Sequence, residues 1–109
     1  MNCESSRQIW DTIRHTTCTD RYLDLLQSAA RYARLRVDWK LETEAGEKAR
    51  IDAERTRAHD AFIADCNVLR RAMEQAGEET LWRSTLTNDR REIGDFACWL
   101  HAIMGIEAR

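Results

Sequence analysis

The chain has 109 residues, of which 43% are hydrophobic and 33% charged, and its formal net charge at pH 7 is −2. This composition is typical of one globular domain and excludes a disordered chain of low hydrophobicity and high net charge. The small negative charge argues against nucleic-acid binding, because no overall positive field attracts phosphate backbones. The sequence has no proline and only four glycines, which favours long helices.

The sequence also bears on the cellular compartment. No stretch approaches the roughly 18 consecutive apolar residues that a membrane span needs. The first residues lack the basic start and apolar run of a secretory signal. We therefore expect a cytoplasmic protein without a membrane partner, and we expect its four cysteines to be reduced thiols.

Apolar residues recur at helical spacing in the first forty residues. A short helix is expected over residues 4–14, ending at the threonine-rich run 15–19. Its expected core contacts are Ile9, Trp10 and Ile13. A long helix is expected over residues 20–43, with Thr19 as its N-cap. With residues placed at about 100° intervals, its predicted core face consists of Tyr22, Leu26, Ala29, Ala30, Ala33, Val37 and Leu41.

The long helix carries a second apolar stripe beside this face. The second stripe consists of Leu25, Tyr32, Leu35 and Trp39. A helix this broadly apolar is usually buried on more than one side. Either the short N-terminal helix covers the second stripe or a second chain does. Tyr32, Leu35 and Trp39 are therefore the predicted interface of a homodimer.

The second half of the chain predicts two more helices. The third is expected from residue 47 or 51 to residue 76, with Gly77 just after its end. A break before it near Ala45 and Gly46 is left open, because a lone glycine is tolerated inside a helix. Residues 78–88 form a connection whose spacing allows a short helical turn. The last helix begins near residue 88 or 89 and ends at Gly105, and Asp89 with Glu92 resembles a capping box.

These elements predict an all-α fold. We expect a compact bundle of about four helices, two long and two shorter, that forms a single domain over residues 1–109. Whether the bundle is a monomer or a dimer is left open.

Two pairs of metal-ligand residues stand out. His15 with Cys18, and Cys98 with His101, are each three residues apart, which places both members of a pair on nearly one face of a helix. Together the pairs could supply the four ligands of a structural zinc site. We favour chance placement, and no metal or other cofactor is predicted.

A polar site is a third candidate, between the third and last helices. Arginines there could bind carboxylates or phosphates through two parallel hydrogen bonds. We favour the alternative, an intramolecular network of arginines and acidic residues that orients the helices. The predicted residues are His59, Asp60, Asn67, Trp82, Arg83, Arg90 and Asp95.

Several motifs in this half of the chain form a recognisable pattern. They are the run Arg55-Thr56-Arg57-Ala58-His59-Asp60-Ala61-Phe62-Ile63, then Asn67, Trp82-Arg83, and Asp89-Arg90-Arg91-Glu92-Ile93-Gly94-Asp95-Phe96-Ala97-Cys98. The pattern resembles a family of small uncharacterised bacterial proteins, a domain of unknown function, over about half of the chain. That resemblance draws attention to the polar site, but it implies no activity.

Three functional hypotheses follow. The leading one is a non-enzymatic helical module that acts through protein–protein contact, as a homodimer or with another protein partner. The second is a small-molecule or anion binder, or a weak enzyme, that uses the polar cleft. The third is a phage or mobile-element protein that inhibits a host complex, which the small size and mixed charge permit.

Overall fold

The computed structural model describes residues 3–107, which form helices and, within that range, no strand. The five helices are α1 (Cys3–Ile13), α2 (Thr19–Leu41), α3 (Ala45–Gln75), α4 (Leu81–Thr85) and α5 (Arg90–Glu107). The all-α fold is confirmed. The count is five where about four were predicted, because the helical turn allowed within the 78–88 connection forms α4.

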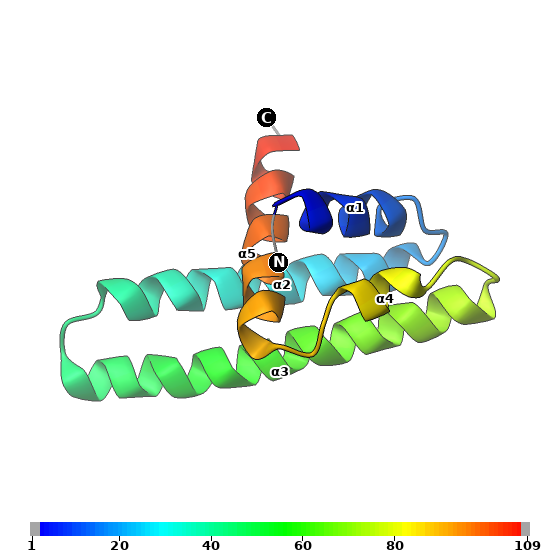
Figure 1. The fold of residues 1–109 in the computed structure, drawn as a ribbon. Helices are drawn as coiled ribbons and strands as arrows, with labels where there is room; N and C mark the ends of the chain where they lie inside the picture. The colour runs from blue at the N-terminus through cyan, green and yellow to red at the C-terminus, as the bar shows by residue number, and fades with distance from the viewer. Residues whose placement is uncertain (1–2, 108–109) are drawn as a thin grey trace.

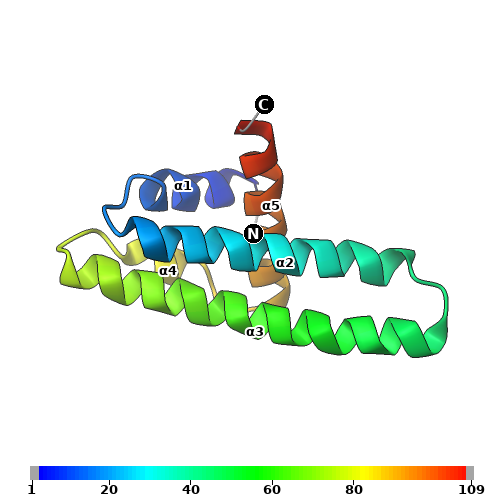
Figure 2. The same cartoon turned by 180° about the vertical axis from the view of Figure 1, so that it is seen from behind.

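The two long helices form the frame of the molecule. α2 and α3 make an antiparallel hairpin, and α5 crosses it steeply (Figure 1). α1 and α4 lie along the half of the hairpin that contains the start of α2 and the end of α3. The other half, here called the distal half, extends beyond α5 with no further helix beside it (Figures 1 and 2). The molecule is therefore elongated, with extents of 48 × 28 × 24 Å.

The core lies where α5 crosses the hairpin and where α1 and α4 pack against it. The predicted contacts of α1 are confirmed, since Ile9, Trp10 and Ile13 are all buried. Phe62 of α3 and Phe96 of α5 pack with their ring centroids 6.2 Å apart. Other fully buried side chains come from three helices and from the position after α4, and include Leu25, Leu69, Met73, Leu86, Ile93 and Leu100.

The start of α2 differs from the prediction. Thr19 is the first helical residue and not the N-cap, and Cys18 before it makes no side-chain capping hydrogen bond. The carboxylate of Glu78, just after α3, instead holds the loop that precedes α2. It accepts hydrogen bonds from the Thr17 N–H at 3.2 Å, from the Thr16 hydroxyl at 2.7 Å and from the Thr17 hydroxyl. One half-buried carboxylate thus links two turns that are distant in the sequence.

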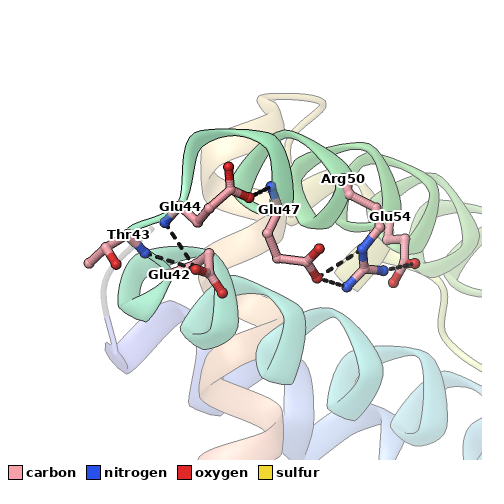
Figure 3. A network of polar contacts seen from close by, with 6 residues as sticks. All are labelled: Glu42, Thr43, Glu44, Glu47, Arg50 and Glu54. Carbon is pink, nitrogen blue, oxygen red and sulfur yellow. Dashed lines mark hydrogen bonds and ion pairs between the residues drawn. The ribbon is translucent and has the colours of Figure 1, made fainter.

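The turn between α2 and α3 settles whether the long helices are continuous. α2 ends at Leu41, and residues 42–44 form the turn. The Glu42 carboxylate accepts hydrogen bonds from the N–H groups of Thr43 at 3.1 Å and Glu44 at 3.0 Å (Figure 3). Glu44 then caps α3 by accepting the Gly46 N–H at 2.9 Å. These two side chains satisfy the backbone donors that the break exposes.

Two other predicted helix ends are confirmed. Gly77 follows α3 with a φ of 76°, and its N–H donates to the Glu74 carbonyl at 3.0 Å. A left-handed residue at this position is the usual end of a helix. At the start of α5, the Asp89 carboxylate accepts the Glu92 N–H at 3.0 Å, which is the first half of the predicted capping box. The Asp89 N–H donates to the Thr87 hydroxyl instead of to Glu92.

Candidate functional site

The two Cys/His pairs do not form a zinc site. Among residues 3–107, no three histidine, cysteine or acidic side chains lie together in a way that could hold a metal ion. His15 and His101 are exposed. Cys98 lies beside Arg36, whose Nη1 is 3.5 Å from the Cys98 sulfur. Helical spacing brought each pair onto one face, but the fold does not bring the two pairs together.

The predicted polar site divides into two separate groups. In the first, the Arg83 Nε donates to the Asn67 side-chain oxygen at 2.9 Å. Its Nη1 donates to the Leu86 carbonyl at 2.7 Å. Trp82 beside it is buried, and its indole Nε1 has no hydrogen-bond partner in the described chain. This group holds the 78–88 connection against α3, but the oxygens that Arg83 binds are amide and carbonyl oxygens and not those of the acidic residues expected from the sequence.

The second group joins α3 to the first turn of α5. The His59 Nε2 donates to the Arg90 carbonyl at 2.7 Å, and its Nδ1 has no partner among the described residues. The Arg90 guanidinium donates to Asp60 at 3.1 Å. Asp95 turns to α2 instead, where it forms an ion pair with Arg36 at 2.9 Å. The side chains of this group are thus partly paired with each other.

An open cavity of about 360 Å³ lies over this second group. It is lined by side chains of α2, α3 and α5, namely Tyr32, Arg36, Arg55, Thr56, His59, Arg90 and Arg91. The sequence identified His59 and Arg90, but it placed Arg83 and Asp95 with them, and neither lines the cavity. It missed Arg36 and Arg91 as members of the site, because charged residues spread around a helix give no sign of which neighbour they face.

Gly94 explains how α5 comes so close to this cavity. A Cβ added at Gly94 would lie 2.6 Å from the Tyr32 hydroxyl oxygen. Real Cβ atoms do not approach so closely, so only glycine allows the first turns of α5 to rest on Tyr32. The ring of Tyr32 in turn stands edge-on to His59, with centroids 5.3 Å apart. Burial raises the pKa of the Tyr32 hydroxyl, which therefore stays protonated near neutral pH.

The predicted interface residues contact their own chain. Tyr32 is buried, and Leu35 and Trp39 are half-buried. The Trp39 ring lies between two cations of α3, the Lys48 Nζ and the Arg55 Cζ, each 4.3 Å from the ring centroid. The sequence expected either the N-terminal helix or a second chain to cover this stripe. In the structure α3 covers Trp39, because the two long helices run side by side.

The predicted core face of α2, and not its second stripe, is exposed near the end of the helix. Val37 and Leu41, predicted to belong to the core face, are 54% and 75% exposed. This part of the prediction is wrong because α5 crosses α2 before these residues and ends the coverage there. An open and mostly apolar corner of about 360 Å³ lies where α5 meets the distal half of α2. Its lining residues are Ala33, Arg34, Val37, Asp38, Cys98 and His101.

Cys66 lies two helical turns from His59 on α3. The side chain is 1% exposed, in the core. Burial raises the pKa of its thiol to about 12. A thiol that stays protonated and inaccessible is not a nucleophile, so Cys66 acts as a small apolar core residue.

No protein-family model, curated protein or solved structure matches this chain. The resemblance to a bacterial family of unknown function therefore stays a prediction. Within residues 3–107, no helix combines the length and apolar character that crossing a lipid bilayer requires. The fold itself defines the class, which is an all-α protein with a projecting helical hairpin.

Proposed function

We propose that this protein is a helical interaction module that pairs with a second copy of itself through the distal half of α2. One observation carries the proposal. The apolar stripe of α2 continues past α5 for two turns, so that Val37 and Leu41 face solvent. An apolar stripe that no element of its own chain covers is typical of a surface that binds another protein.

A second copy fits this surface because the surface is self-complementary. Arg34 and Asp38 flank Val37 on one side of the helix, four residues apart. Neither has an ion-pair partner in the described chain. When two identical helices pair antiparallel across a two-fold axis, the start of one patch meets the end of the other. Arg34 of each copy then faces Asp38 of the other, the two Val37 side chains meet near the axis, and Leu41 lies opposite residue 31 of the other copy.

The corner between α5 and α2 gives such a pair a defined position. On one side of α5, the corner against α2 is filled by α1 (Figure 1). On the other side the equivalent corner is open and lined by Ala33, Val37 and Cys98. In an antiparallel pair, the end of α2 from the second copy would occupy this open corner. Four helices, two from each hairpin, would then pack as a bundle.

At the tip of the hairpin, the side chains of Glu42 and Glu44 hold the turn between α2 and α3. Beyond the turn, Arg50 lies between Glu47 and Glu54, and its Nη1 donates to Glu54 at 2.7 Å (Figure 3). A second opening of about 300 Å³ separates the ends of α2 and α3 and is lined in part by Leu35, Leu41 and Ile51. The apolar walls of this opening also gain cover when a second copy docks.

The test is the oligomeric state as a function of concentration, measured by sedimentation equilibrium. We expect the wild type to form a dimer. The double variant V37K/L41K should weaken it at least about tenfold, since burying such side chains contributes about 1–2 kcal/mol each when they start half exposed. Leu23→Lys is the matched control, because Leu23 is 49% exposed near the other end of α2. It should leave the dimer unchanged.

Charge exchange tests the two-fold arrangement itself. Arg34→Asp and Asp38→Arg should each weaken the homodimer, because like charges then face each other. An equimolar mixture of the two variants should form a heterodimer, and the double exchange R34D/D38R should restore the homodimer. A wild-type chain that stays monomeric would refute self-pairing. If the protein is a dimer whose affinity none of these substitutions at Val37, Leu41, Arg34 and Asp38 changes, its interface does not include the distal half of α2.

A further inference from the structure

We propose that the arginine-lined cavity between α2, α3 and the start of α5 binds a phosphate group, either free phosphate or the head of a small phosphorylated molecule. The cavity brings four guanidinium groups together from three helices: Arg36, Arg55, Arg90 and Arg91. Among the described residues, no aspartate or glutamate lines it. This concentration of positive charge contrasts with the chain as a whole, whose net charge is −2.

Carboxylates next to the cavity form ion pairs with three of these arginines, and each guanidinium keeps N–H donors that its carboxylate does not bind. Arg36 pairs with Asp95 at 2.9 Å, and Arg55 pairs with Asp52 on its own helix. A guanidinium has five N–H donors in a fixed plane, and a single carboxylate leaves some of them free. Arg90 is held in the same way by Asp60, at 3.1 Å. The pairs thus fix where each guanidinium lies.

Arg91 is the cation that remains uncompensated. It lines the cavity, is exposed, and has no ion pair within the described residues. The four guanidinium groups meet only three carboxylates, so one positive charge is left over. Arg91 also lies in the first turn of an 18-residue helix, where the helix dipole adds positive potential.

Two neutral features complete the site. The Tyr32 hydroxyl makes no hydrogen bond to the described residues, and burial keeps it protonated by raising its pKa. It is therefore a free donor in the wall of the cavity. The Arg55 guanidinium is stacked on Trp39 at 4.3 Å, which holds its plane in one orientation. Fixed donors bind a ligand better than mobile ones, because less freedom is lost on binding.

The number and placement of donors favour a phosphate over a carboxylate. One carboxylate has two oxygens and is saturated by one or two guanidinium groups. Donors from four arginines and a tyrosine suit an anion with three or more oxygens and a double negative charge. A volume of about 360 Å³ lies at the small end of ligand pockets. The space suits a phosphate group with a short organic portion.

Titration calorimetry and amide NMR on the full chain test this site. The probes are inorganic phosphate, glycerol 3-phosphate, sulfate and acetate at constant ionic strength. We expect saturable binding of the phosphates that shifts the amide signals of Arg90, Arg91 and Gly94, with weaker binding of sulfate and none of acetate. Affinity should fall as chloride rises. The ratio between glycerol 3-phosphate and inorganic phosphate shows which source the site prefers.

The Arg91→Gln variant tests the site alone, because Arg91 has no ion pair among residues 3–107 whose loss would disturb the fold. It should weaken phosphate binding about fivefold to tenfold, as expected for the loss of a charge-assisted contact. Arg57→Gln is the matched control. Arg57 is exposed on α3 and lies outside the cavity, and its loss should leave the affinity unchanged. Equal losses in the two variants, or the absence of saturable phosphate binding, would overturn the proposal.

Discussion

Replacing Gly94 with alanine tests the close packing of α5 on α2. A glycine inside a helix is about 1 kcal/mol less favourable than alanine, so propensity alone predicts a gain of that size. The added Cβ would lie 2.6 Å from the Tyr32 hydroxyl oxygen and 3.1 Å from its Cζ. Tyr32 is 7% exposed and its ring stands edge-on to His59, so moving the ring aside would disturb that contact. Overpacking costs about 1–3 kcal/mol, and we expect a net loss of about 1 kcal/mol.

Urea denaturation followed by far-UV circular dichroism measures this loss. Gly105→Ala on the same helix is the control, because an added Cβ there meets nothing within 4 Å, and it should stabilise the protein. Tyr32→Phe removes the closest atom and breaks no hydrogen bond to the described residues. It should be nearly neutral alone and should relieve much of the loss in G94A/Y32F. If Gly94→Ala stabilises as much as Gly105→Ala, the close contact does not exist in solution.

Two further predictions concern ionisable side chains. Hydrogen bonds from Thr17 and Thr16 lower the pKa of Glu78. Its ionised form therefore stabilises the fold above the ordinary carboxyl pKa, and this contribution disappears as the pH falls through the lowered pKa. Glu78→Gln should be less stable than wild type at neutral pH, with the gap closing in acid; urea midpoints across pH test this, and a constant gap would contradict it. Iodoacetamide should label exposed Cys3 in the native protein and buried Cys66 only after denaturation, which mass spectrometry resolves; fast native labelling of Cys66 would contradict its burial.

The sequence was a good guide to elements whose signals are local. Helical periodicity located all the long helices, and it identified Ile9, Trp10 and Ile13 as core. The end of α3 at Gly77 and the cap at Asp89 were also predictable, because each depends on residues only a few positions apart. The start of α2 was not. The loop before it is held by the Glu78 carboxylate, and a partner about sixty residues away leaves no local pattern.

The two apolar stripes of α2 show what periodicity leaves out. Spacing at 100° per residue assigns side chains to faces, but it does not say how far along a face a neighbouring helix reaches. α3 runs beside α2 and covers Trp39. α5 crosses α2 steeply, and a steep crossing covers only a short length of helix. Val37 and Leu41 lie beyond that crossing, so a face that was correctly grouped was wrongly expected to be buried along its whole length.

The polar residues were grouped too broadly for a related reason. His59 and Asn67 both lie on α3, but eight residues along a helix separate them by about 12 Å. His59 therefore meets Arg90 at the start of α5, whereas Asn67 meets Arg83 in the connection before it. Sharing a helix does not make two residues members of one site. After α3, the chain runs back along this helix, so the connection meets Asn67 first and the start of α5 meets His59 after it.

The position of α5 governs both surfaces proposed above, and Arg36 lies where they meet. Arg36 lines the arginine cavity, and its Nη1 also reaches the Cys98 sulfur at 3.5 Å. Cys98 in turn lines the corner where a second copy would dock. An anion that draws the Arg36 guanidinium toward the cavity would loosen its contact with Cys98 and so alter the wall of that corner. If both proposals hold, linkage requires the reverse effect to be equal in size, and Arg36 is the side chain through which the two surfaces would be coupled.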